Sequence, residues 1–419
     1  MGVRTGFTAE PSLPLLSNVP GAGTNAGPQK ESAGEIAQEI VLFERTRYAR
    51  KVMSVRGTFF PPLALVIGLS PALYAQDSEL PTPEEYAERA EVAENAPLFQ
   101  SEEPLKTTLL TDIKWLRDKR IDTMEVNGIL TFAGVDGAQI EQAIEVRTRG
   151  IFRRNKRNCN FPPLRFNFPK REMEGTVFEG QDKLKLVTPC HDGRDNYQRY
   201  VYREYLAYKA YQLLTPVSFR VRLVEITYED INDKYDTRTK IGFLIESDEN
   251  MAERNRAVHT EYHGRFHPAW VDGDAAVRVA MFNYMIGNTD WSAVAGHNTK
   301  LIKTEEAKYL TVPYDFDFSG AVNARYASPD PSLTERYRLR RVTDRHFRGF
   351  CRPELVQPTL AATLNEQRDA LWDLYMSFDL LEEKRRKDAV KYYEDFYKTL
   401  NDERDFKRKM LDVCRALPG

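Results

Sequence analysis

The order of two hydrophobic patterns most constrains the fold of this 419-residue chain. Between residues 104 and 246, short runs alternate apolar and polar residues, as half-buried strands do, and one run at 198–214 has helical spacing instead. From residue 272 onward helical patterns dominate. Strands and one helix followed by helices predict an α+β fold of two lobes, a β-rich N-lobe at 101–250 and a helical C-lobe at 251–419.

The N-terminal hundred or so residues are predicted to lie outside these lobes. Residues 1–52 begin with a stretch rich in Gly, Pro, Ser, Thr and Asn, which predicts disorder, or an upstream misreading if translation starts at Met53. Residues 53–75 have the basic start, apolar run and small final residue of a signal peptide, and 76–100 read as an acidic linker. The prediction is an exported protein, periplasmic, in the cell envelope or extracellular, with no stable transmembrane segment after signal cleavage.

The charges of the chain are nearly balanced, with 60 Lys and Arg residues against 62 Asp and Glu and a formal net charge of −2. This balance argues against nucleic acid as a partner. Short basic clusters at 153–157 and 336–341 are interpreted as solvated faces.

Four cysteines are compatible with an oxidising compartment. Cys159 and Cys190 flank an apparent β region, whereas Cys351 and Cys414 bracket the C-terminal helical patterns, so two disulfides are possible. Three pairings exist, and the sequence does not choose among them.

Two short segments, 287–298 and 313–320, carry the residues with the strongest chemical signal. Asp290 is followed eight residues later by Asn298, then by an apolar hairpin at 299–312, then by Asp315. Kinase-like proteins present their machinery in this order, with one Asp facing the acceptor hydroxyl while an Asn and a later Asp hold the metal on the nucleotide phosphates. Helix capping and strand ends could explain each segment alone, but their combination favours a site.

Further segments resemble the CotH family of secreted, atypical protein-kinase-like proteins and, more distantly, the HipA-type kinases. Residues 144–150 are similar to the arginine-glycine stretch that opens a CotH domain, 202–208 to its first helix, and 240–246 to the strand that reaches its hinge. The resemblance spans roughly residues 100–350. It implies a bilobal protein-kinase-like fold and transfer of the γ-phosphoryl group of ATP, with Mg²⁺ or Mn²⁺, to a hydroxyl acceptor on a protein or glycan.

The resemblance also implies roles for individual residues of the two segments. Asp290 would be the catalytic Asp, Asn298 the second metal ligand, and Asp315 the metal-binding Asp. Asp317 stands where ordinary kinases have Gly, so that Asp315 and Asp317 could share the metal.

Two parts of this assignment stay open. The interval before the second metal ligand is longer than in ordinary kinases, so Asn288 or His297 are alternatives for it. On the nucleotide side, Lys185 lies on a predicted strand and Glu204 on the next helix, as a phosphate-anchoring pair requires. Lys183 projects from the same face as Lys185 and is nearly as good a candidate. The competing interpretation is that all three are surface residues.

The sequence therefore predicts an exported kinase-like phosphotransferase that moves the γ-phosphoryl group of ATP to a hydroxyl acceptor, on a protein in the first instance. The alternative is a non-catalytic cell-envelope or surface module in which the Asp residues hold a structural cation or only shape a cleft. A metal-dependent phosphoesterase is a third possibility, but the chain lacks the His-rich metal spacing expected of one.

Overall fold

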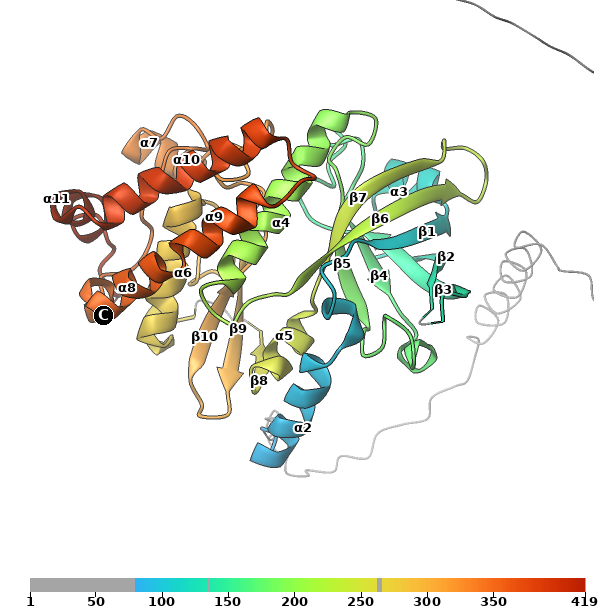
Figure 1. Cartoon of the computed structure of the whole chain (residues 1–419), viewed down its shortest axis with the longest axis horizontal. Helices are drawn as coiled ribbons and strands as arrows, with labels where there is room; N and C mark the ends of the chain where they lie inside the picture. The colour runs from blue at the N-terminus through green and yellow to red at the C-terminus, as the bar shows by residue number, and fades with distance from the viewer. Residues whose placement is uncertain (1–79, 135, 262–265, 419) are drawn as a thin grey trace, which may run out of the picture. The chain divides into compact units, whose positions relative to one another are not determined.

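The first seven strands of the chain close into a barrel (Figure 1). The computed structural model describes residues 80–134, 136–261 and 266–418. Their order around the barrel is β1-β2-β3-β4-β5-β7-β6. All neighbours are antiparallel except β1 and β6, which run parallel and close the barrel. The strands are β1 (Leu105–Thr111), β2 (Val126–Ala133), β3 (Gln139–Thr148), β4 (Leu164–Asn167), β5 (Lys183–Val187), β6 (Val221–Asp230) and β7 (Arg238–Ile245).

Alternate residues of these strands fill the barrel interior, as the two-residue period of a strand requires. Strand β1, for example, buries Thr107, Leu109 and Thr111 and leaves the residues between them more exposed. The apolar core of the barrel is made mainly by Leu109, Leu130, Phe132, Ile144, Val146, Leu164, Phe166, Leu184, Leu186, Val224, Ile226 and Leu244.

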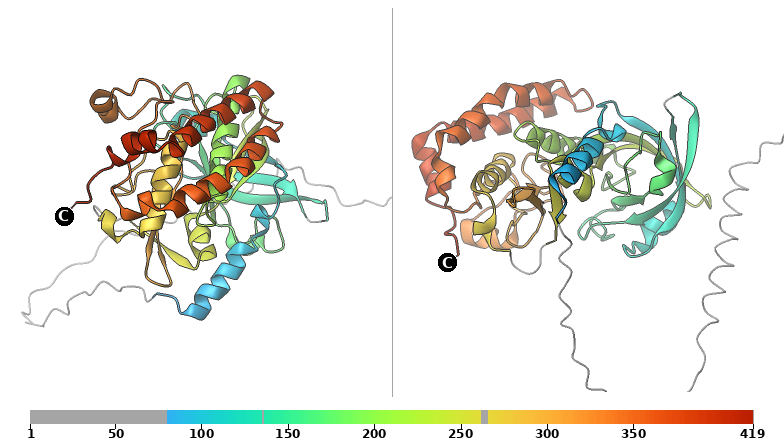
Figure 2. Two further views of the ribbon diagram at one scale, coloured as in Figure 1. Left: turned by 60° about the vertical axis from the view of Figure 1, so that its left-hand side comes forward. Right: turned by 90° about the horizontal axis from the view of Figure 1, so that it is seen from below.

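Helix α4 (Gln198–Gln212) lies between the barrel and the C-terminal helices (Figures 1 and 2). It contacts β6 and β7 on one side and α9 (Arg368–Met376) on another. The helix predicted at 198–214 is thus confirmed, but it is enclosed on nearly all sides rather than amphipathic, since the buried residues run almost without a break from Tyr200 to Tyr211.

A second, three-stranded sheet in the order β10-β9-β8 lies beyond the barrel in the chain. Strands β9 (Thr299–Thr304) and β10 (Tyr309–Pro313) form the hairpin predicted at 299–312, and β8 (Ala257–Thr260) pairs with β9. The helices around these sheets are α2 (Pro83–Glu94), α3 (Ile113–Lys119), α5 (Asp248–Arg254), α6 (Gly273–Ile286), α7 (Pro331–Tyr337), α8 (Pro358–Glu366), α10 (Glu383–Leu400) and α11 (Glu403–Phe406).

The predicted bilobal protein-kinase-like fold, with a β-rich N-lobe and a helical C-lobe, is wrong. The strands form a closed mixed barrel instead, and the part predicted as a helical lobe contributes a sheet of its own. The physical reason is that β1 would be an unpaired edge in an open sheet, whereas here its edge is satisfied by β6 from far along the chain. Local periodicity identifies strands but not such a partner.

Two disulfides join the four cysteines. Cys159 pairs with Cys190, and Cys351 pairs with Cys414. The first ties the irregular segment between β3 and β4 to the residues after β5, and the second ties the C-terminal end back to the segment before α8. Of the three pairings that the sequence left open, the structure selects this one.

The segments predicted as a disordered extension (1–52) and a signal peptide (53–75) lie outside the described residues. Within the predicted acidic linker at 76–100, residues Pro83–Glu94 form helix α2, capped by Thr82 and Glu85 in a reciprocal capping box. No helix within residues 80–134, 136–261 and 266–418 combines the length and the apolar character that a membrane crossing needs.

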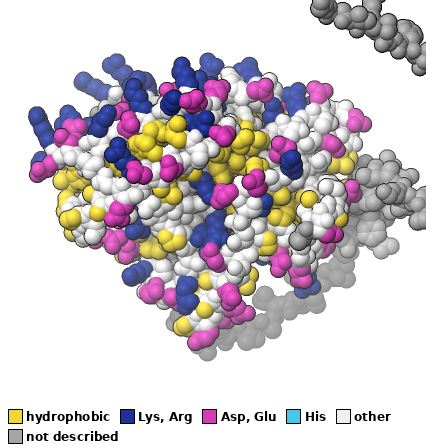
Figure 3. Space-filling view, viewed as in Figure 1, with side chains coloured by type: hydrophobic (Ala, Val, Ile, Leu, Met, Phe, Trp, Pro, Cys, Tyr) yellow, Lys and Arg dark blue, Asp and Glu magenta, His cyan; other side chains and the backbone are white. Residues whose placement is uncertain are grey.

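Basic side chains are frequent along the edge that α7, α10 and α11 occupy, where acidic side chains lie among them (Figure 3). In α10, and between α11 and the turn after it, several of these charges pair within one helical turn, as Lys387 does with Glu383 and Lys409 with Asp405. Arg336, Arg338, Arg340 and Arg341 are all exposed, which matches the interpretation of the cluster at 336–341 as a solvated face.

Gly242 is expected to be the least replaceable residue of β7. A Cβ atom there would lie 2.5 Å from the Val187 carbonyl oxygen on the neighbouring strand β5. We expect Gly242→Ala to lower the free energy of unfolding by about 1–3 kcal/mol, because the strands must separate to accept the methyl group. Urea denaturation would measure this, with the exposed Thr239→Ala on the same strand as the control; equal midpoints for the two variants would contradict the expectation.

Candidate functional site

The buried side-chain amides of Asn283 and Asn288 shape the turn that follows α6. Gly287 ends the helix in the left-handed conformation (φ 65°), and Asn288 Nδ2 then donates to Asn283 Oδ1 over 2.9 Å. Asn288 Oδ1 accepts the backbone N–H of Asp290 over 2.9 Å. Asn288 therefore uses both side-chain atoms to shape the turn, which removes it as an alternative metal ligand. The helix itself is capped by Asp272, whose side chain accepts from the Ala275 N–H.

Asp290, His297 and Asn298 form one hydrogen-bonded group. His297 Nε2 lies 2.8 Å from Asp290 Oδ1, and Asn298 Nδ2 donates to the Asp290 backbone oxygen over 2.7 Å and to Oδ2 over 3.2 Å. The bond to Asp290 raises the pKa of His297. These contacts fix the direction of the Asp290 carboxylate, while no described residue donates to Asn298 Oδ1, so that this oxygen is available to a cation.

The β9–β10 hairpin returns the chain to the same place and delivers Asp315 and Asp317. Asp315 adopts a left-handed backbone (φ 62°), and its N–H donates to the Tyr208 hydroxyl on α4 over 2.8 Å. Asp317 is 5% exposed and accepts from the Tyr326 hydroxyl over 3.1 Å. No hydrogen bond or ion pair from any described residue reaches the Asp315 carboxylate.

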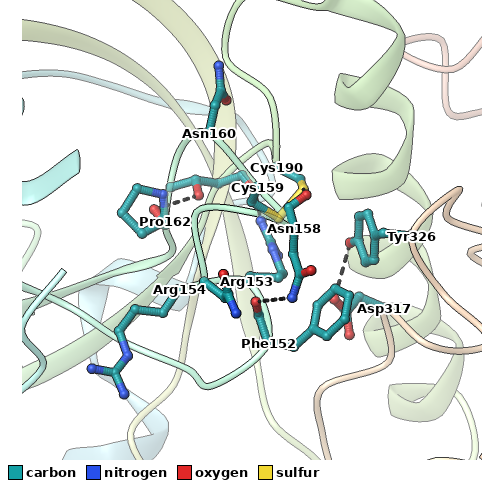
Figure 4. The surroundings of a disulfide bond; sticks show 12 residues. Phe152, Arg153, Arg154, Asn158, Cys159, Asn160, Pro162, Cys190, Asp317 and Tyr326 are labelled. Carbon is teal, nitrogen blue, oxygen red and sulfur yellow. Dashed lines mark hydrogen bonds between the residues drawn. A yellow bond between two sulfur atoms is a disulfide. The ribbon is translucent and has the colours of Figure 1, made fainter. Parts of the chain in front are cut away.

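Glu204 on α4 completes a group that we call the acidic cluster, namely Glu204, Asp290, Asp315 and Asp317. Glu204 is 1% exposed, and its Oε2 lies 3.9 Å from Arg153 Nη1. Burial and the nearby carboxylates of Asp317 and Asp315 raise its pKa well above the usual value, and Arg153 opposes this. Burial, and then Asp315, raise the pKa of Asp317 to about 7. Figure 4 shows Asp317, Tyr326 and Arg153 beside one of the disulfides.

Lys185 does not form the predicted pair with Glu204. Its Nζ lies 2.6 Å from Asp248 Oδ1 at the start of α5, and Lys300 Nζ binds the other oxygen of Asp248 at 2.7 Å. Burial lowers the pKa of Lys185 to about 8, against the attraction of Asp248. Lys183, the alternative, is exposed at the start of β5. Glu204 instead lies beside Arg153, which comes from the segment between β3 and β4.

The donor set of the acidic cluster suits Mg²⁺ or Mn²⁺. Within the described residues, no three His, Cys, Asp or Glu side chains stand ready to hold a metal ion by themselves. Magnesium usually takes only one or two protein carboxylates and fills its other positions with water and phosphate oxygens. Asp315, Asp317 and the free amide oxygen of Asn298 are such a set, and the raised pKa of Asp317 marks a buried site with an excess of negative charge.

The raised pKa of Asp317 predicts how the stability of the protein depends on pH. Between pH 3.8 and about 7 the folded protein keeps a proton on Asp317 that the unfolded chain has lost, so rising pH favours the unfolded chain. In a chelating buffer, we expect Asp317→Asn to flatten the fall in unfolding free energy across this window, because Asn does not titrate. Urea midpoints at several pH values would measure it, and parallel curves for both proteins would contradict the raised pKa.

Sequence reasoning missed four residues of this region: Arg153, Asp248, Lys300 and Tyr326. Arg153 belongs to a basic run that was interpreted as a solvated face, and no periodicity marks it as buried because its segment is irregular. Asp248 and Lys300 come together only through the packing of α5 against the second sheet. The one available signal for Asp248 was an acidic residue shortly after the strand that ends near residue 246.

No protein-family model matches the chain, and a search of curated proteins finds no similar sequence. The resemblance to the CotH family accordingly stays a prediction.

Proposed function

We propose that the chain is a metal-dependent phosphotransferase that moves the γ-phosphoryl group of ATP to a hydroxyl acceptor on a protein or glycan. The observation that supports it best is the acidic cluster, where Asp290 is fixed by hydrogen bonds near the carboxylates of Asp315 and Asp317. No ion pair within the described residues reaches either of these two carboxylates, although Arg153 attracts them. Structural carboxylates normally have partners, whereas carboxylates crowded without them are typical of sites that bind a charged ligand.

In this proposal Asp290 handles the proton, and Asp315, Asp317 and Asn298 hold the metal. Asp290, oriented by His297 and Asn298, accepts the proton of the acceptor hydroxyl. Asp315, Asp317 and Asn298 Oδ1 hold Mg²⁺ or Mn²⁺, which neutralises charge on the phosphates. The buried surroundings strengthen these interactions, because the field of a charge is less screened away from water.

The test is a thermal-shift titration of the full chain with ATP and either Mg²⁺ or Mn²⁺, beside Asp315→Ala. A ligand that binds only the folded state raises the unfolding midpoint by mass action. We expect a rise that needs the metal and is lost in the variant. No rise with either metal would reject the nucleotide site and favour the non-catalytic surface module, whose carboxylates would bind a cation alone or nothing.

We also propose that the protein is exported. The signal-like pattern at residues 53–75 supports this, and so do the two disulfides, because disulfides are rare in reducing compartments. Fractionation of cells that produce the full chain would test it: the mature protein should be found outside the cytoplasm and be shorter than the translated chain.

A further inference from the structure

Arg153 is the buried cation that faces the acidic cluster. It lies in the irregular segment between β3 and β4, and its side chain is only 8% exposed, although its neighbours in the sequence are more open to solvent. Its Nη1 lies 3.9 Å from Glu204 Oε2, and its Nη2 donates to the Thr188 carbonyl. Asp317 and Asp315 also attract its charge.

This pairing leaves hydrogen-bonding capacity unused on both sides. Arg153 Nε and Glu204 Oε1 are buried, and neither has a hydrogen-bond partner among the described residues. A separation of 3.9 Å joins the two charges as an ion pair but is too long for a hydrogen bond. Buried polar groups without partners cost free energy, and native proteins keep few of them. A ligand that accepts from the guanidinium would satisfy this open donor.

We propose that Arg153 is the residue that binds the phosphates of the nucleotide donor, in the role predicted for Lys185; this inference rests on the proposed function. Phosphate oxygens accept hydrogen bonds from a guanidinium, whose planar fork fits them well. The carboxylates of Asp315 and Asp317 attract the charge of Arg153. In this proposal the metal on these carboxylates and the guanidinium bind the same phosphate group. Glu204 holds Arg153 in place, as the helix glutamate does for a phosphate-binding cation.

Lys185 is less suited to this role because its ammonium group is already engaged. It binds Asp248 at 2.6 Å and lies over the ring of Tyr314, 5.0 Å from the centroid. Asp248 also binds Lys300, so one carboxylate holds both ammonium groups. Arg153, by contrast, keeps one donor, Nε, without a hydrogen-bond partner among the described residues.

The Cys159–Cys190 disulfide positions the segment that carries Arg153 (Figure 4). Thr188, whose carbonyl accepts from Arg153, comes two residues before Cys190, and the Cys190 carbonyl accepts the N–H groups of Asn160 and Phe161. The strand end and the segment are therefore joined by a covalent bond and by hydrogen bonds around Arg153. A guanidinium held this firmly loses little freedom when a phosphate binds.

The experiment compares ATP with adenosine, because only the phosphates should depend on Arg153. Isothermal titration calorimetry with Mg²⁺ would give the Kd of each ligand for the full chain, for Arg153→Gln, for Arg153→Lys and for Arg157→Gln. Arg157 is an exposed arginine of the same segment and controls for the loss of charge. We expect Arg153→Gln to reduce the preference for ATP over adenosine about 10-fold to 100-fold, and Arg157→Gln to keep it.

The outcomes separate this inference from the proposed function. If the unchanged chain binds no ATP with Mg²⁺ or Mn²⁺, the proposed function and the role of Arg153 are both rejected. If it binds ATP and folded Arg153→Gln keeps the preference, Arg153 is only structural and the proposed function stands. If Arg153→Gln does not fold, Arg153→Lys decides: an unchanged preference overturns the inference, and a reduced one supports it. Loss of the preference in Lys185→Met but not in Arg153→Gln would assign the role to Lys185.

Discussion

Asp290→Asn is expected to lower the rate of ATP turnover about 10²-fold to 10⁴-fold, the range that a positioned general base contributes. The amide keeps the shape of the side chain and can still lie beside His297, but it cannot take up the proton of the acceptor. Binding of ATP with Mg²⁺ should remain, because Asp315 and Asp317 hold the metal in the proposal. Release of ADP with water as the acceptor measures turnover, and calorimetry measures binding.

The matched control is Asp274→Asn, which removes an exposed carboxylate at the start of α6, the helix that leads to Asp290. It should leave turnover and binding unchanged. Equal turnover in the unchanged chain and in Asp290→Asn would remove Asp290 from the chemistry even if ATP binds. A joint loss of turnover and binding would instead place Asp290 among the residues that hold the nucleotide.

Replacing Cys351 and Cys414 together by Ser is expected to lower the free energy of unfolding by about 4 kcal/mol. This disulfide spans 63 residues, and a cross-link stabilises mainly by limiting the unfolded chain, more so for a longer loop. In the folded state the same region is also joined by backbone hydrogen bonds, from Cys351 N–H to the Arg415 carbonyl and from Arg415 N–H to Gly349. These bonds keep the ends together when the sulfurs are absent.

Denaturation in guanidinium chloride measures this effect, with the Cys159→Ser and Cys190→Ser pair as the comparison. That disulfide spans 31 residues. Halving the length of a loop changes the free-energy cost of closing it by only about 0.6 kcal/mol. The two double variants should thus lose similar stability. Their affinities for ATP should differ, since only the Cys159–Cys190 disulfide lies beside Arg153. Unchanged denaturation midpoints for both double variants would contradict the expectation, because they would mean that losing a disulfide gives the unfolded chain no additional conformational freedom.

Local structure could be predicted where one face of an element is buried. The strand that carries Lys185 and the hairpin at 299–312 follow from the sequence pattern, and their positions are confirmed within a few residues. Helix α2 was missed because its charged residues show no apolar stripe, and its stability depends on its caps and on packing against α5. Barrel closure was missed because it depends on one pairing between segments far apart in the chain.

The sequence predicted that Asp290, Asn298 and Asp315 belong to one site. In the structure Asn298 donates to Asp290, and the chemistry of these residues stays a prediction. The ion-pair partners of the charged residues could not be predicted, because they depend on packing. Lys185 and Glu204 have the right spacing for each other, yet they bind Asp248 and Arg153. Both partners come from segments without a periodic pattern, and several partners within reach cannot be ranked by spacing alone.

The parallel pairing of β1 with β6 also sets a limit on when this protein can fold during synthesis. Leu105 is paired with Val224, so a ribosome must deliver the residues of β6 before the barrel can close. Until then, β1 is an exposed edge that other chains can join. Pairings between distant segments are slow to form because the loop between them must first be ordered. The nascent chain therefore has a long interval in which a chaperone that covers β1 would protect it from aggregation.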